Sequence, residues 1–124
     1  MNGNNILLDT NTVVYHLSGN QQAKLIIDNR VVFISAITYA ELLANKNLSS
    51  DDKKILDDYL SFVHIIHTND FICERAAYIR IKNKLKLPDA IIAATSIFLG
   101  IPFVTFDDGF FSIKELQIIK LSVQ

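Results

Sequence analysis

Five short apolar segments, spread along the chain, are the feature that most constrains its fold. They cover residues 6–8, 31–34, 63–66, 103–105 and 118–121, and their apolar residues mostly follow one another rather than alternating with polar residues. Short continuous apolar segments are typical of parallel strands that are covered on both faces. We therefore predict a parallel sheet that is buried between two layers.

The stretches between these segments carry apolar residues at helical spacing. Pro88 suits the first position of a helix, and a capping serine, Ser49, precedes acidic residues that favour a helix start. The predicted helices cover residues 12–17, 21–28, 37–46, 51–62, 70–85 and 88–99. Because strands and helices alternate, we predict an α/β fold, a three-layer α/β/α sandwich around the sheet.

The length and composition indicate one globular domain, residues 1–124. Half of the residues are apolar and mean hydropathy is +0.27, which excludes a disordered chain. Twelve Lys and Arg residues against thirteen Asp and Glu residues give a formal charge of −1. The molecule is therefore not a broadly basic nucleic-acid-binding protein, and any such contact must be local.

Two features predict a soluble protein in a reducing cytoplasm. Cys73 is the only cysteine, so no intrachain disulfide can form. The longest apolar stretch, residues 90–106, is interrupted by Gly100 and Pro102 and falls short of the ~20 residues that a membrane-spanning helix needs.

Four acidic residues are expected at one edge of the sheet. Asp9 ends the first predicted strand, and Asp107 follows the fourth. Asp89 stands at the start of the helix that runs antiparallel to the fourth strand. Because this helix and this strand are of similar length, Asp89 and Asp107 should lie at the same edge of the sheet. Glu41 lies about one turn inside its helix, from which its longer side chain can reach the edge.

Carboxylates that meet in this way select a particular kind of ligand. Two unit charges 4 Å apart repel by about 4 kcal/mol at an effective dielectric constant near 20, so a cation or protonation must relieve the repulsion. Oxygen ligands without His or Cys favour Mg²⁺ or Mn²⁺ over zinc. Such an ion promotes the hydrolysis of phosphodiester bonds.

Each acid also has an ordinary explanation. Asp9 could cap the following helix, and Asp89 could stabilise a helix dipole. Asp107 and Asp108 could form a turn before Gly109. Glu41 could be a solvated helix residue, although its apolar neighbours make exposure unexpected. Only the shared edge favours the functional interpretation.

Four motifs in order resemble the PIN domain family, the nuclease fold of the VapC toxins. They are Leu7-Leu8-Asp9-Thr10-Asn11, Ser35-Ala36-Ile37-Thr38-Tyr39-Ala40-Glu41-Leu42, Leu87-Pro88-Asp89-Ala90-Ile91-Ile92-Ala93-Ala94-Thr95 and Val104-Thr105-Phe106-Asp107-Asp108-Gly109-Phe110. The resemblance covers nearly the whole chain.

The resemblance implies a five-stranded parallel sheet and a metal-dependent endoribonuclease that leaves a 5′-phosphate and a 3′-hydroxyl. It implies that four acids bind Mg²⁺ or Mn²⁺ and carry catalysis: Asp9, Glu41, Asp89 and Asp107. It also implies that Asn11 and Thr105 are polar supports nearby and that Asp108 is a possible substitute acid. It also implies a homodimer and a cognate antitoxin whose tail occludes the active site.

Three basic residues and a pair of histidines are further candidate sites. Arg75, Lys82 and Lys86 would share one face if their helix reached Lys86, and they are candidate RNA contacts, although an ordinary solvated face is the preferred interpretation. His64 and His67 should point to opposite faces of a strand, which argues against zinc.

Two further features concern surfaces. Cys73 has no obvious base partner, so we expect a buried structural thiol. The helices at residues 37–46 and 51–62 carry apolar side chains that belong to the core, to a dimer interface or to an antitoxin groove.

The sequence as a whole favours a metal-dependent ribonuclease that cleaves RNA as the toxin of a toxin–antitoxin pair. One alternative is a receiver-like signalling domain that binds Mg²⁺, but such domains need an acidic pair after the first strand, where Asp9 is alone. A second alternative is a PIN-like module that binds RNA or protein without catalysis.

Overall fold

The computed structural model describes residues 3–123, so that residues 1, 2 and 124 of the predicted domain lie outside it. Its sheet has five strands, in the order β3-β2-β1-β4-β5, and every pairing is parallel. The strands are β1 (Asn5–Leu8), β2 (Val31–Ser35), β3 (His64–Ile66), β4 (Phe103–Thr105) and β5 (Ile118–Lys120). The predicted parallel sheet is confirmed.

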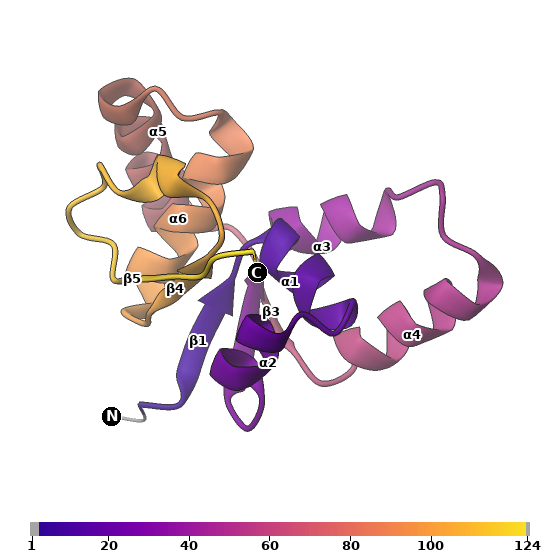
Figure 1. Cartoon of the computed structure of the whole chain (residues 1–124). Coiled ribbons are helices and arrows are strands. Elements are labelled where there is room, and N and C mark those ends of the chain that lie inside the picture. The colour runs from indigo at the N-terminus through magenta and orange to yellow at the C-terminus, as the bar shows by residue number, and fades with distance from the viewer. Residues whose placement is uncertain (1–2, 124) are drawn as a thin grey trace.

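Helices cover both faces of this sheet (Figure 1). They are α1 (Thr10–Leu17), α2 (Gln21–Ile27), α3 (Ala36–Leu43), α4 (Ser50–Leu60), α5 (Asp70–Asn83) and α6 (Leu87–Leu99), with a short 3₁₀ helix, η1 (Asp108–Phe110). The α/β/α sandwich predicted from the alternation of strands and helices is confirmed.

Side chains of the central strand divide the core into two halves, because neighbouring residues of a strand face opposite ways. Leu7 packs among residues of α5 and α6, whereas Ile6 and Leu8 pack among residues of α1, α2 and α4. All three leucine and isoleucine side chains are fully buried. This burial fixes β1, and with it the position of the residue that follows, Asp9.

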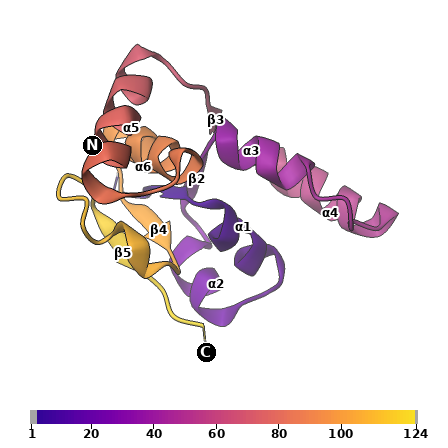
Figure 2. The ribbon, with the colours of Figure 1, turned by 90° about the horizontal axis from the view of Figure 1, so that it is seen from above.

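The helices α3 and α4 form a hairpin that extends away from the sheet (Figures 1 and 2). Ser35 begins α3 directly at the end of β2, since its side chain accepts a hydrogen bond from the Ile37 N–H. Ser49 caps α4 in the same way at Asp52. Glu41 therefore lies on the first helix of the hairpin, six residues after Ser35.

Two details of α5 differ from expectation. The helix ends at Asn83 because Lys84 adopts a left-handed conformation (φ 57°), so Lys86 lies beyond α5, just before α6, and cannot share its face. Cys73 is exposed, and the predicted buried thiol is wrong. The buried stripe of α5 instead consists of Ile72, Ala76 and Ile79.

Within residues 3–123, none of the helices combines the length and the apolar character that crossing a membrane requires.

Candidate active site

One pocket at the carboxyl edge of the sheet holds all four predicted acids, and we call it the acid pocket. Its volume is about 450 Å³. It is lined by Asp9, Thr10, Asn11, Glu41, Ala44, Asp89, Asp107 and Phe110. Four separate elements contribute the carboxylates, so the pocket exists only in the folded chain.

Asp9 is the most enclosed of the four carboxylates, with only 7% of the residue exposed. Its Oδ1 accepts hydrogen bonds from the Thr12 backbone N–H (3.0 Å) and the Thr12 hydroxyl (2.5 Å), and its Oδ2 accepts one from the Thr105 hydroxyl (2.6 Å). Asp9 thereby caps α1, as its ordinary interpretation predicted, and also lines the pocket. Capping α1 and lining the acid pocket are therefore compatible roles for Asp9.

The environment of Asp9 disfavours its charge. Burial raises the pKa of the Asp9 carboxyl, the hydrogen bonds from Thr105 and Thr12 oppose this rise, and the charge of Asp107 adds to it. A buried carboxylate with a raised pKa is stabilised in its charged form by a nearby cation.

Thr105 connects Asp9 to Asp107. The fully buried Thr105 hydroxyl donates to Asp9 and accepts a hydrogen bond from the Asp107 backbone N–H (3.0 Å). Asp107 itself is exposed, and its Oδ1 accepts the Gly109 N–H (2.7 Å) at the start of η1. Asp108 does not line the pocket and instead pairs with Lys120 at 3.1 Å. Asp107 is therefore the better placed of the two acids.

Glu41 lies at the mouth of the acid pocket and is exposed, so the expectation from its apolar neighbours is wrong. The Thr10 hydroxyl donates to Glu41 Oε1 and lies 3.1 Å from the hydroxyl of the buried Thr38. These threonines hold the glutamate across the gap between α1 and α3. Sequence reasoning assigned no role to Thr10, Thr12 or Thr38, although each belongs to a motif or borders one.

Asp89 occupies the first turn of α6, where no side chain caps the helix. Partial burial raises the pKa of the Asp89 carboxyl, and repulsion by Glu41, Asp107 and Asp9, in that order, raises it further. Lys86 opposes the rise. The three other acids therefore lie near enough to Asp89 for their charges to act on it, as the shared edge predicts.

The donor set of the pocket fits a hard divalent cation, because carboxylates are its charged ligands and no His or Cys lines it. In the part of the chain that is described, no three acidic, His or Cys side chains are drawn tightly enough together to enclose an ion. Three of the four carboxylates are turned toward the hydrogen-bond donors named above.

Of the three predicted RNA contacts, Arg75 and Lys82 lie on α5, whereas Lys86 lies beyond it at the start of α6. Lys86 lies close enough to the acid pocket to influence Asp89. Arg75 is paired with Glu115 at 2.6 Å, and Lys82 lies over the Tyr78 ring, 6.0 Å from its centroid. Asn11 lines the acid pocket.

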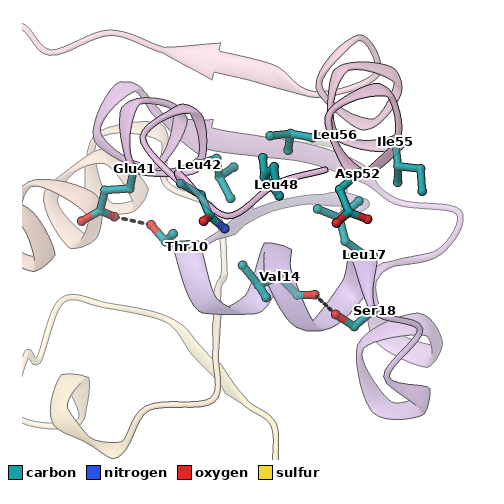
Figure 3. Close-up of a pocket in the computed structure, with 11 residues that line it drawn as sticks. Thr10, Val14, Leu17, Ser18, Glu41, Leu42, Leu48, Asp52, Ile55 and Leu56 are labelled. Atoms are coloured by element: carbon teal, nitrogen blue, oxygen red, sulfur yellow. Dashed lines mark hydrogen bonds between the residues drawn. The ribbon is translucent and has the colours of Figure 1, made fainter. Parts of the chain in front are cut away.

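A second, larger pocket adjoins the first, and we call it the apolar groove (Figure 3). Its volume is about 530 Å³ and it lies between α1, α3 and α4. It is lined by Thr10, Val14, Leu17, Ser18, Glu41, Leu42, Asn45, Leu48, Asp52, Ile55 and Leu56. Thr10 and Glu41 line both spaces, so the groove opens directly beside the acids.

Comparison with known proteins gives consistent results. The PIN domain family matches residues 6–116. Ribonuclease VapC2 of Methanocaldococcus jannaschii is 32% identical over 145 residues, which cover 98% of this chain and 97% of that protein.

Solved structures agree with these sequence matches. A toxin–antitoxin complex from Klebsiella pneumoniae contains a chain with a TM-score of 0.80 and 30% identity, covering 93% of this chain and 96% of that one. FitAcB from Neisseria gonorrhoeae gives a TM-score of 0.76 and 26% identity, covering 93% and 96%.

Proposed function

Because this chain belongs to the PIN domain family, we propose that it is a ribonuclease of the VapC type, which cleaves RNA phosphodiester bonds with Mg²⁺ or Mn²⁺. The observation that carries the proposal is the acid pocket, where four elements bring Asp9, Glu41, Asp89 and Asp107 together. Related proteins are named as a ribonuclease and as toxins in toxin–antitoxin complexes, which supports the same activity here.

In this proposal the four carboxylates hold the divalent cation, which supplies Lewis acidity at the phosphoryl oxygens when it is bound. Thr12 and Thr105 keep the Asp9 oxygens in a fixed orientation. We assign the orientation of the attacking water to Glu41, an exposed carboxylate of the pocket whose side chain Thr10 holds in place.

The decisive test is Asp9→Asn, which preserves the shape of the side chain but removes its charge. Purified wild type should cleave an RNA pool in Mn²⁺ and stop in EDTA, and the variant should lose at least about 100-fold in rate because an essential cation ligand is missing. Asp108→Asn is the matched control, since Asp108 does not line the acid pocket, and it should cleave within a few-fold of wild type.

If the folded wild type showed no metal-dependent cleavage, the nuclease proposal would fail, and a PIN-like module that binds without catalysis would be the remaining interpretation. Undiminished cleavage by Asp9→Asn would show that the acid pocket is not the active site.

We further propose that the apolar groove receives a segment of a cognate antitoxin. Its apolar wall would accept the apolar face of a peptide, and its opening beside Glu41 would let a basic residue of that peptide reach the acids. Ile55→Glu, a change at an exposed lining residue, should prevent copurification with the antitoxin while cleavage persists. Equal copurification of this variant and wild type would contradict the assignment.

The homodimer implied by the family resemblance and the assignment of the whole chain to one domain also remain proposals. A particle mass of about twice 14.0 kDa in solution would support the dimer.

A further inference from the structure

One face of α5 alternates aromatic and basic side chains. Phe71, Arg75, Tyr78 and Lys82 are spaced by four, three and four residues, which places them along one side of the helix, and we call them the α5 stripe. From Phe71 to Lys82 the stripe spans about 16 Å at 1.5 Å per residue. The acid pocket takes no residue from it.

The rings of the stripe remain accessible. Phe71 is 43% exposed and Tyr78 is 51% exposed, so both rings can be reached from solvent. The Arg75 guanidinium carbon lies 5.7 Å from the Phe71 centroid and 5.9 Å from the Tyr78 centroid, and the Lys82 Nζ lies 6.0 Å from the Tyr78 centroid. Each exposed ring is therefore beside a positive charge.

Two hollows in the surface meet at Tyr78. The first, of about 260 Å³, is lined by Phe71, Glu74, Arg75 and Tyr78. The second, of about 390 Å³, lies between α5 and residues 112–115 and is lined by Tyr78, Ile79, Lys82, Asn83, Ser112, Ile113, Lys114 and Glu115. The second hollow adds the ammonium group of Lys114 to the cations of the stripe.

Both walls of the second hollow are close in sequence to residues of the acid pocket. Ser112 lies two residues after Phe110, which lines the acid pocket. On the other side, the chain runs from Asn83 at the end of α5 to Asp89, passing Lys86, whose charge acts on the Asp89 carboxyl. A polymer held at the acids could therefore continue onto the stripe.

We propose that the α5 stripe is a binding track for single-stranded RNA outside the acid pocket, a role that rests on the proposed function. Bases stack on Tyr78 and Phe71, and Lys82, Lys114 and Arg75 contact the phosphates. Stacking on exposed rings combined with cations along the backbone is how proteins hold single strands without reading their sequence. The formal charge of −1 makes such a local cationic path necessary.

Glu115 restrains this track. Its Oε2 lies 2.6 Å from Arg75 Nη1, so it occupies the cation that would otherwise contact a phosphate. Glu115 thereby limits the affinity of the track in the free protein.

The test measures binding apart from cleavage. A labelled 12-nucleotide RNA pool of random sequence is titrated with full-length protein in Mg²⁺, with every variant built on Asp9→Asn so that the RNA stays intact. Tyr78→Ala should weaken binding about tenfold, whereas Tyr78→Phe, which keeps the ring, should bind like its parent. Lys82→Gln should make the slope of log affinity against log salt shallower by about 0.7.

Glu115→Gln provides a test in the opposite direction. Because it releases Arg75 and removes a negative charge, it should tighten binding about threefold. Two matched controls lie on the other side of the molecule: Phe62→Ala removes a ring that is 85% exposed, and Lys54→Gln removes an exposed ammonium group. Both should bind like the parent.

Three outcomes would overturn the track: the parent fails to bind the pool, Tyr78→Ala and Lys82→Gln bind it as the parent does, or Tyr78→Ala alters the particle mass in solution while RNA affinity stays constant. The last would make the stripe a protein interface. If the stripe variants lose binding but the wild type with Asp9 intact does not cleave in Mn²⁺, the track stands and the proposed nuclease activity fails.

Discussion

A single buried hydroxyl joins two of the four carboxylates. Thr105→Val keeps the size of the side chain but removes both the donor to Asp9 and the acceptor of the Asp107 N–H. We expect RNA cleavage to fall about 10- to 100-fold, as is typical when a residue that orients metal ligands is lost. The free energy of unfolding should fall by about 1–2 kcal/mol, because the Asp107 N–H loses its partner.

Thr95→Val is the matched control for this change. The Thr95 hydroxyl is also buried but donates to the Ile91 carbonyl within its own helix. Its loss should leave the cleavage rate unchanged. Cleavage by Thr105→Val within twofold of wild type would show that the hydroxyl does not position the acids.

At this scale the sequence predicted which acids meet but not how they are held. The strand ends fix the level of Asp9 and Asp107, so their convergence follows from parallel pairing. The exposure of Glu41 depends instead on the angle at which α3 leaves the sheet, which local sequence does not encode. The same angle brings Thr10 and Thr38 together, and a contact between residues 28 positions apart has no local signal.

At the scale of elements, a chain of hydrogen bonds ties α4 to α1 and to the end of α2. His16 Nδ1 lies 2.8 Å from the Tyr59 hydroxyl, and His16 Nε2 lies 2.8 Å from Asp28 Oδ1. Since a carboxylate only accepts, the Nε2–H donates to Asp28, and in a neutral imidazole Nδ1 is then the acceptor for the tyrosine hydroxyl. Burial and the charge of Asp28 raise the pKa of Tyr59, so the hydroxyl keeps its proton.

Tyr59→Phe removes this link without removing the ring. We expect the free energy of unfolding to fall by about 1 kcal/mol, and hydrogen exchange to accelerate in α4 but not in α5 or α6, because the lost hydrogen bond joins α4 to α1 and involves neither α5 nor α6. Tyr15→Phe, whose ring packs 4.3 Å from that of Phe106, is the control and should leave exchange in α4 unchanged. Equal exchange in both variants would contradict the proposed link.

The same hydrogen bonds make the stability of the fold depend on pH. The hydrogen bond from His16, followed by the charge of Lys24, lowers the pKa of the exposed Asp28 carboxyl from its usual 3.8. A lowered pKa means that this group stabilises the fold above about pH 4 and that the contribution is lost as pH falls through the folded-state value.

Asp28→Asn should therefore lower the urea midpoint at pH 7, and the difference from wild type should shrink toward pH 3. In a His16→Gln background the same substitution should produce a smaller difference. A difference that is equal at both pH values would be inconsistent with the hydrogen bond as the cause.

Most strands and helices could be predicted from sequence because the spacing of their apolar residues agrees with the positions that are buried. The ends of these elements could not be predicted in this way. The end of α5 depends on Lys84, which adopts a left-handed conformation without the glycine that usually signals it. That single residue separates Lys86 from the face that Arg75 and Lys82 share. The exposure of Cys73 follows from which stripe of α5 meets α6, a tertiary property.

At the scale of the whole molecule, repulsion among the acids opposes folding, and a cation should relieve it. Wild type should unfold in one transition whose midpoint rises with Mg²⁺, by the equivalent of about 2.7 kcal/mol at 100 times the dissociation constant. Asp89→Asn should be more stable than wild type without Mg²⁺, by about 1 kcal/mol, and should gain less from its addition.

Thermal unfolding with Mg²⁺ and then with EDTA measures both effects independently of cleavage. If wild type and Asp89→Asn respond equally to Mg²⁺, the acid pocket is not the cation site. Two separate transitions would argue against a single domain.

The walls shared by the acid pocket and the apolar groove have a thermodynamic consequence. Because Thr10 and Glu41 belong to both, an occupant of one space must alter the energy of an occupant of the other. Linkage then requires reciprocity: if a peptide in the groove weakens Mg²⁺ binding by some factor, Mg²⁺ weakens the peptide by the same factor. The Mg²⁺ concentration would in this way set how firmly the peptide is held.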